Sequence, residues 1–163
     1  MLCRYLTLLG YHMSTDPMLP LVPLNYARQM DIYYEDLQAV IADSGEDLDT
    51  SELRAAIDTF RTQAQEAKAL ETQAEDTGDT ALMQVVNTKY RDFQRGFTSQ
   101  GGLPNREFFQ HTIFAPGLDT GYAAVTFPGI TEAITNYDDF EMAAEWVVKT
   151  SAAIRVAGNI LKT

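Results

Sequence analysis

Few side chains in this sequence are of the types that carry out catalysis or hold a metal. Its 163 residues include two histidines, His12 and His111, and a single cysteine, Cys3. Catalytic zinc sites need a cluster of histidine, cysteine or acidic ligands, and the sequence shows neither such a cluster nor the HExxH pattern. No serine lies in the G-x-S-x-G turn of the hydrolases. The residues therefore predict no catalytic apparatus, metal or cofactor within this chain.

The remaining polar candidates have structural explanations that we prefer to catalytic ones. His111 lies in an aromatic-rich stretch, and we expect it to hydrogen-bond the backbone of its own loop. Asp138 and Asp139 precede a helical segment, where carboxylates favour the helix dipole. The acidic run at residues 46–49 could attract calcium, but it lacks the spacing and the glycine of an EF-hand.

The acidic charge of the chain limits its partners. The formal net charge is −11, from 12 basic and 23 acidic residues. Nucleic-acid binding depends on basic residues that neutralise phosphates, and anionic membranes attract basic segments. We therefore expect neither nucleic acid nor direct membrane contact. A lone cysteine excludes an intrachain disulfide, and a domain of this size has enough core without one.

Four segments repeat apolar residues at the spacing of amphipathic helices. The predicted helices span about residues 25–43, 51–75, 80–97 and 138–161. Asp49 and Glu52 form a candidate capping box for the second of them. Shorter helices are expected over residues 2–13 and 129–136. The connections predict an all-α fold, a four-helix bundle with a long ordered crossover loop.

The last predicted helix has more small and apolar residues than one buried face requires. Its expected core stripe comprises Phe140, Ala144, Val147, Ser151, Ile154, Gly158 and Leu161. Trp146, Ala153 and Ala157 lie on a second face. Close packing inside one bundle is the favoured explanation of these residues, and contact with another subunit or domain is the alternative.

The crossover loop, residues 101–130, is the main departure from the helical pattern. Loops longer than about 12–15 residues are uncommon in compact domains and are usually functional or disordered. This loop is rich in residues that favour burial: Phe108, Phe109, Ile113, Phe114, Tyr122, Val125 and Phe127. A brief strand at residues 111–114 is the only β-type pattern. We therefore expect an ordered loop that covers a surface or meets a partner.

The order of residues around this loop resembles a known family. Residues 87–97 read N-x-x-Y-R-x-F-x-R-x-F, residues 102–116 read G-L-P-x-R-x-F-F-x-H-x-I-F-A-P, and residues 127–130 read F-P-G-I. This order is similar to that of the C-terminal helical dimerisation domain of the transferrin receptor and glutamate carboxypeptidase II (prostate-specific membrane antigen) group. The match is dense over residues 85–135 and collinear, though weaker, over most of the remaining chain.

The resemblance implies a domain organisation and a set of partners. Residues 1–24 would connect from an absent upstream peptidase-like domain, and residues 25–163 would form the dimerisation domain of an excised or truncated piece. A homodimer is expected, with loop 101–130 packing on or near that peptidase-like domain of the same protein. Zinc is implied only for the absent domain. Members of the family are often membrane-anchored with an extracytoplasmic catalytic part, or vacuolar, which is the setting expected of the parent protein.

The resemblance also suggests roles for individual loop residues. In the peptidases of this group, a Lys-Tyr pair helps to bind the terminal carboxylate of a glutamate-like substrate. Tyr122 matches the tyrosine, whereas Gly121 replaces the lysine and cannot supply a cation. The residues expected to shape the loop are Pro104, Arg106, His111, Pro116, Phe127, Pro128 and Gly129.

These observations favour a non-catalytic homodimerisation domain of a peptidase-like or receptor-like protein. The first alternative is the substrate-pocket portion of a zinc-dependent carboxypeptidase or aminopeptidase with altered carboxylate selectivity. The second alternative is a receptor-like bundle that binds another protein.

Overall fold

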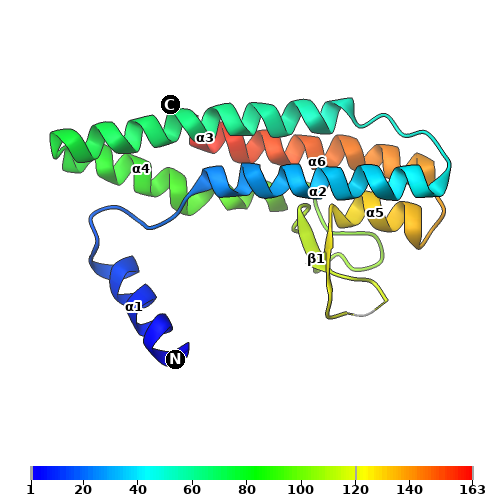
Figure 1. Ribbon diagram of the computed structural model, residues 1–163, viewed down its shortest axis with the longest axis horizontal. Coiled ribbons are helices and arrows are strands. Elements are labelled where there is room, and N and C mark those ends of the chain that lie inside the picture. The colour runs from blue at the N-terminus through cyan, green and yellow to red at the C-terminus, as the bar shows by residue number, and fades with distance from the viewer. Residues whose placement is uncertain (1, 120, 163) are drawn as a thin grey trace.

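A bundle of four long helices forms the body of the molecule in the computed structural model, which describes residues 2–119 and 121–162 (Figure 1). These helices are α2 (Pro23–Ser44), α3 (Ser51–Thr77), α4 (Thr80–Asp92), which continues as the 3-10 helix η1 (Phe93–Thr98), and α6 (Phe140–Leu161). The expected all-α four-helix bundle is confirmed.

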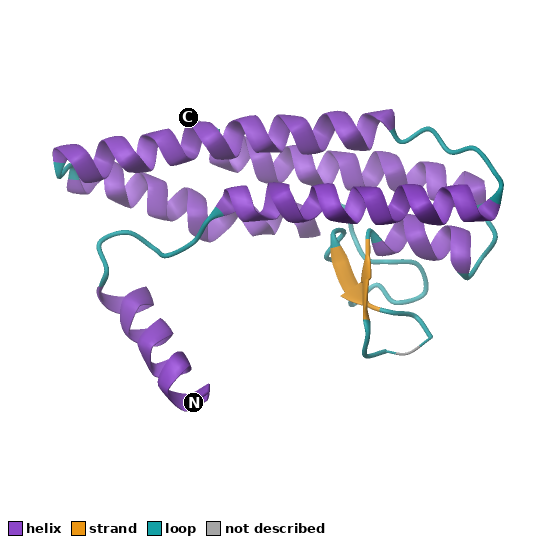
Figure 2. Ribbon diagram, in the orientation of Figure 1, coloured by secondary structure: helices purple, strands orange, loops and turns teal. Residues whose placement is uncertain are grey.

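Smaller elements project from the bundle or fill its ends (Figure 2). They are α1 (Leu2–Thr15), β1 (Phe114–Pro116), β2 (Ala124–Thr126) and α5 (Pro128–Thr135). The two strands pair antiparallel, with Ala115 opposite Val125. In the part of the chain that the structure describes, no helix is long and apolar enough to cross a membrane.

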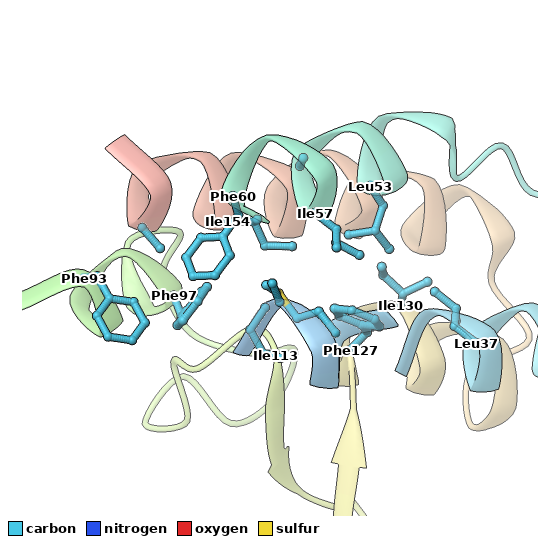
Figure 3. Packing of buried hydrophobic residues seen from close by; sticks show 14 of the residues in the cluster. Leu37, Leu53, Ile57, Phe60, Phe93, Phe97, Ile113, Phe127, Ile130 and Ile154 are labelled. Atoms are coloured by element: carbon cyan, nitrogen blue, oxygen red, sulfur yellow. The ribbon is translucent and has the colours of Figure 1, made fainter. Parts of the chain in front are cut away.

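The core lies between α3 and the elements packed around it (Figure 3). Phe60 of α3 packs against Phe93 and Phe97 of η1, with ring centroids 6.1 and 5.8 Å apart. Ile57 and Ile130 are fully buried in the same cluster. Burial of a side chain of this size contributes about 1.5–3 kcal/mol, so this apolar stripe accounts for much of the packing energy.

Two glycines allow the closest approaches to α6. A Cβ atom on Gly96 would overlap the backbone of Ala157, and one on Gly129 would overlap the ring of Trp146. Ala153, Ala157 and Trp146 are consequently buried within the chain itself. Close packing inside the bundle is therefore confirmed for these residues, and the alternative that these three form a face toward another subunit is wrong. Ala144, expected in the core stripe, is instead exposed.

The ends of the helices follow local hydrogen bonds. Asp79 caps α4 by accepting from the N–H groups of Ala81 and Leu82, each at 3.0 Å. Asp139 caps α6 in the same way through Met142 at 2.8 Å, which confirms the role expected for an acidic residue at this position.

The predicted capping box at the start of α3 is wrong. Thr50 is the residue before the helix, and its hydroxyl bonds the hydroxyl of Tyr34 on α2 at 2.9 Å. Glu52 does not reach back to the helix start but bonds Arg155 of α6 at 2.6 Å. Asp49 still accepts from the N–H of Ser51 at 2.9 Å, but the contact with α6 has taken the Glu52 side chain that the local pattern assigned to the cap.

Two further boundaries differ from the sequence pattern. The predicted third helix changes to a 3-10 helix at Phe93, where Gly96 approaches α6 and has a low helix propensity. The predicted strand at residues 111–114 begins only at Phe114. The backbone N–H groups of Ile113 and Phe114 point instead to the ring of His111.

Candidate functional site

The loop between η1 and α5 is fixed at its base by the core. Thr112 donates from both its backbone N–H and its hydroxyl to the carbonyl of Phe97, at 3.0 and 3.1 Å. The N–H of Phe127 donates to the carbonyl of Ile113 at 2.9 Å, and both side chains are almost fully buried. Phe127 adopts a left-handed backbone conformation with φ of 43°, which turns the chain into α5. The loop therefore begins and ends on a rigid platform.

An ion pair closes the middle of the loop. The guanidinium of Arg106 donates to the carbonyl of Pro116 and to the carboxylate of Glu132 on α5. The other carboxylate oxygen of Glu132 accepts from the N–H of Leu118 at 2.9 Å. The side chains of Arg106 and Glu132 are only 11% and 5% exposed. Loss of either partner would leave a buried charge unpaired, which typically costs about 3–5 kcal/mol.

Glu132 is a site residue that the sequence did not reveal. It is one of 23 acidic residues and occupies an ordinary position in a short helix. Only its burial beside Arg106 distinguishes it. Because this pairing is visible only in the fold, no sequence signal could have identified Glu132.

His111 is held between aromatic rings at the foot of the loop. Its ring centroid lies 4.2 Å from that of Phe114 and 5.4 Å from that of Phe97. Its Nδ1 atom faces the N–H groups of Ile113 and Phe114 at 3.3 and 3.4 Å, so it acts as an acceptor. Burial lowers the pKa of His111 from its ordinary value of 6.5 to about 4, so the ring is neutral near pH 7.

A tight turn precedes the strands. The N–H of Leu103 donates to the carbonyl of Phe109 at 2.9 Å, and Pro104 lies at the start of the turn. Gly102 has no room for a side chain, because a Cβ would overlap the backbone of Glu107. At the other end, Pro128 and Gly129 open α5 and are buried.

The outer surface of the loop is apolar and exposed. Phe108 is 90% exposed and Tyr122 is 95% exposed, which are extreme values for aromatic side chains. Phe109 and Phe114 are exposed by 37% and 42%. With His111 these residues line an open hollow of about 530 Å³. We call this surface, defined by Phe108, Phe109, Phe114 and Tyr122, the aromatic face of the loop.

A second hollow extends the aromatic face onto the bundle. It has a volume of about 280 Å³ and lies beside α2, where Tyr26, Met30 and Tyr33 meet Ile113 and Phe114. Because Phe114 lines both hollows, the apolar surface is continuous from the loop to α2.

The substrate-pocket candidates lie at the far end of this surface. Gly121 has a positive φ of 62°, and its N–H donates to the carbonyl of Gly117 at 2.8 Å. Tyr122 follows it and lines the larger hollow with His111. Among the residues that the structure describes, no lysine, arginine or carboxylate lines either hollow. The arrangement therefore suits apolar contact.

The described residues do not gather metal ligands at this surface. Among residues 2–119 and 121–162 there is no group of three or more histidine, cysteine or acidic side chains placed to hold a metal ion. The His111 ring in the larger hollow already uses Nδ1 for the loop backbone.

Comparison with known proteins identifies the family to which this helical domain is similar. The family model of the transferrin receptor-like dimerisation domain matches residues 48–162. A probable glutamate carboxypeptidase of Arthroderma benhamiae is 46% identical over 162 residues, which cover 98% of this chain and 22% of that protein. A probable glutamate carboxypeptidase of Arabidopsis thaliana, LAMP1, is 26% identical over 96% of this chain and 23% of its own length.

A further relative has a different description. An inactive zinc metalloprotease of Schizosaccharomyces pombe is 31% identical over 80 residues, 49% of this chain and 10% of that protein. The chain thus spans less than a quarter of the length of each of these relatives. Since the family model covers well over half of the chain, this protein belongs to the transferrin receptor-like dimerisation domain family.

Proposed function

We propose that this chain is a non-catalytic homodimerisation domain of a glutamate carboxypeptidase-like protein, and that its loop docks on the peptidase-like domain of the same protein. The observation that carries the docking proposal is the exposure of Phe108 and Tyr122 on a loop that is otherwise fixed. Large exposed apolar patches mark interaction sites in soluble proteins. A loop that is ordered in advance also loses little conformational entropy when it binds.

The position of α1 is further evidence for a neighbouring domain, on the side of the bundle where the β1–β2 hairpin lies. It projects from the bundle on the side of the hairpin (Figure 1), and none of its residues is buried. Most of its exposed apolar residues share one side of the helix: Leu2, Tyr5, Leu6, Leu8, Leu9 and Met13. An amphipathic helix normally buries its apolar side, so α1 and the aromatic face are suited to enclose one further domain.

Substitution of Phe108 in the full-length protein tests the docking. Phe108→Ser removes an aromatic ring that is 90% exposed and makes no core contact, so the bundle should fold normally. We expect a lower thermal unfolding midpoint of the peptidase-like domain and faster proteolysis of the hairpin. Val85→Ser on α4, a position 48% exposed and distant from the loop, is the matched control. Equal midpoints for Phe108→Ser and Val85→Ser would contradict the docking.

Homodimerisation and the absence of catalysis are tested on the chain itself. Analytical ultracentrifugation should show a dimer at micromolar concentration, and a strictly monomeric chain at high micromolar concentration would reject dimerisation. We propose that zinc belongs only to the peptidase-like domain. The purified chain should then contain no stoichiometric zinc and show no metal-dependent hydrolysis.

A substrate-pocket role is the second candidate, favoured by the position of Tyr122 at the exposed tip of the loop. In the full-length protein, Gly121→Lys should raise kcat/KM for peptides ending in glutamate, because it supplies a cation beside Tyr122. Gly121→Ala is the matched control, since it introduces a side chain at the same positive φ without charge. Unchanged kinetics in Tyr122→Phe and Gly121→Lys would remove the tip from the substrate site.

A further inference from the structure

α6 has an outward ridge of apolar residues that no described part of the chain covers. Val148 is 54% exposed and Val156 is 37% exposed, with the partly exposed Ala152 between them. The three are spaced by four residues, so they form one of the ridges by which helices pack against each other. Within the described bundle helices, α2 and α4 each have one large exposed apolar residue, Ile32 and Val85, and α3 has none.

The charge distribution separates this ridge from the acidic face formed by α2 and α3. The segment formed by α2, the turn at residues 45–50 and α3 contains 13 acidic and four basic residues, a net charge of −9. α6 contains two acidic and two basic residues and is neutral. On α6, Lys149 bonds Glu145 at 3.4 Å, and Arg155 bonds Glu52 of α3 at 2.6 Å.

In a symmetric contact, this difference in net charge favours α6 over the acidic segment as the interface. In a two-fold dimer the same patch of each copy faces its own counterpart. Contact through the acidic segment would therefore set like charges against one another, which costs free energy. Contact through α6 would join two surfaces without net charge, on which Glu145, Lys149 and Arg155 already have ion-pair partners.

We propose that two copies of this chain associate through the ridge Val148, Ala152 and Val156 of α6, with Ala152 nearest the two-fold axis. The proposal rests on the homodimerisation proposed above and gives it a location. Because the second copy runs in the opposite direction, Val148 of one copy meets Val156 of the other. The small side chain of Ala152 lets the two helix backbones approach closely.

The contact extends only onto the part of α3 beside α6, around Thr59, where the charge of Glu52 is already paired with Arg155. A stable interface buries about 800 Å² on each partner, more than one ridge supplies. Thr59 of α3 lies on the same helix face as Glu52 and Gln63, both of which bond α6. Thr59 is exposed, and its hydroxyl already donates to the carbonyl of Ala55 at 2.8 Å. Covering Thr59 would therefore leave no new unpaired donor.

This interface leaves the docking loop accessible. In Figure 1 the hairpin and α1 project from one side of the bundle, whereas α3 and α6 lie toward the other side. A dimer through α6 and a loop docked on another domain are thus compatible.

Sedimentation of two matched variants tests the location of the interface. Val148→Glu places a charge on the ridge, and Val85→Glu places the same charge on α4 at a similarly exposed valine. We expect the dimer dissociation constant to rise at least tenfold for Val148→Glu and to stay at the wild-type value for Val85→Glu. Circular dichroism confirms that both variants are folded.

The outcomes separate this proposal from the proposed function. A wild-type dimer that Val148→Glu leaves unchanged would reject the α6 interface and keep homodimerisation. A wild-type chain that is monomeric at high micromolar concentration would reject both.

A disulfide provides an independent readout of the axis. In a Cys3→Ser background, Ala152→Cys should link two copies under mild oxidation, because counterparts near a two-fold axis come within bonding reach. Ala69→Cys, at an exposed alanine of α3, should give at least tenfold less linked dimer. Equal linking by Ala69→Cys and Ala152→Cys would overturn the placement of Ala152.

Discussion

Acid should weaken this domain through His111, because the folded protein holds the ring in its neutral form. Burial between Phe97 and Phe114 lowers the pKa of His111 from 6.5 to about 4. Below pH 6.5 His111 binds a proton in the unfolded chain but stays neutral in the folded chain until the pH approaches 4. The stabilisation is therefore complete above pH 6.5 and is lost as the pH falls through about 4.

The size of the effect follows from the two pKa values. The gap between 6.5 and about 4 corresponds to about 3 kcal/mol if the site were fully shielded from solvent. The ring of His111 is only partly buried, and solvent screening reduces such effects. We therefore expect about 1–2 kcal/mol of the free energy of unfolding to depend on this residue between pH 7 and pH 4.

The contribution of His111 to the free energy of unfolding can be measured by urea unfolding of the wild type and of His111→Asn at several pH values. The asparagine side-chain oxygen can accept from the N–H groups that Nδ1 now faces, but it does not titrate. Carboxylates titrate in both proteins, so the difference between the two curves isolates His111. Between pH 7 and pH 4 the wild type should lose about 1–2 kcal/mol more than the variant. Parallel curves would refute the assignment of a neutral, desolvated His111.

Three further predictions concern the packing and the ends of the elements. Gly96→Ala should destabilise the domain by about 1–3 kcal/mol or more in urea unfolding, whereas Gly10→Ala, where a Cβ meets nothing within 4 Å, should not destabilise it. Arg106→Met should cost about 3–5 kcal/mol by leaving Glu132 buried and unpaired, and the further change Glu132→Leu should recover part of the loss in a double-mutant cycle. Asp79→Ala should lower the free energy of unfolding by about 1 kcal/mol, because two N–H groups of α4 lose their cap, and an unchanged denaturation midpoint would contradict that role.

The helices were predictable because their apolar spacing agrees with the final packing. Leu53, Ile57 and Phe60 recur at helical spacing and are all buried against the same core. The boundaries that depend on partners were not predictable. Thr50 and Glu52 form bonds to α2 and α6, and no local pattern in the sequence contains those helices.

The loop also has features that the sequence predicts and features that it does not. Its length and aromatic content predicted an ordered segment, and Ile113 and Phe127 are buried as expected. Phe108 and Tyr122 have the same chemical preference but are almost fully exposed. Residue type fixes how strongly a side chain favours burial, whereas the position of the surface that would bury it depends on the whole assembly. Exposed aromatics in a well-anchored loop are informative for that reason.

The aromatic face and the α6 ridge are joined by rigid packing. α5 holds the loop through Glu132 and lies on α6 where Gly129 meets the ring of Trp146. A close-packed connection of this kind fixes the position of the loop relative to α6. Two copies held together at α6 would therefore carry their loops at a fixed separation and orientation. A domain that contacts each loop would be oriented by the dimer, which gives a bundle without catalytic groups a physical means to act on a neighbouring site.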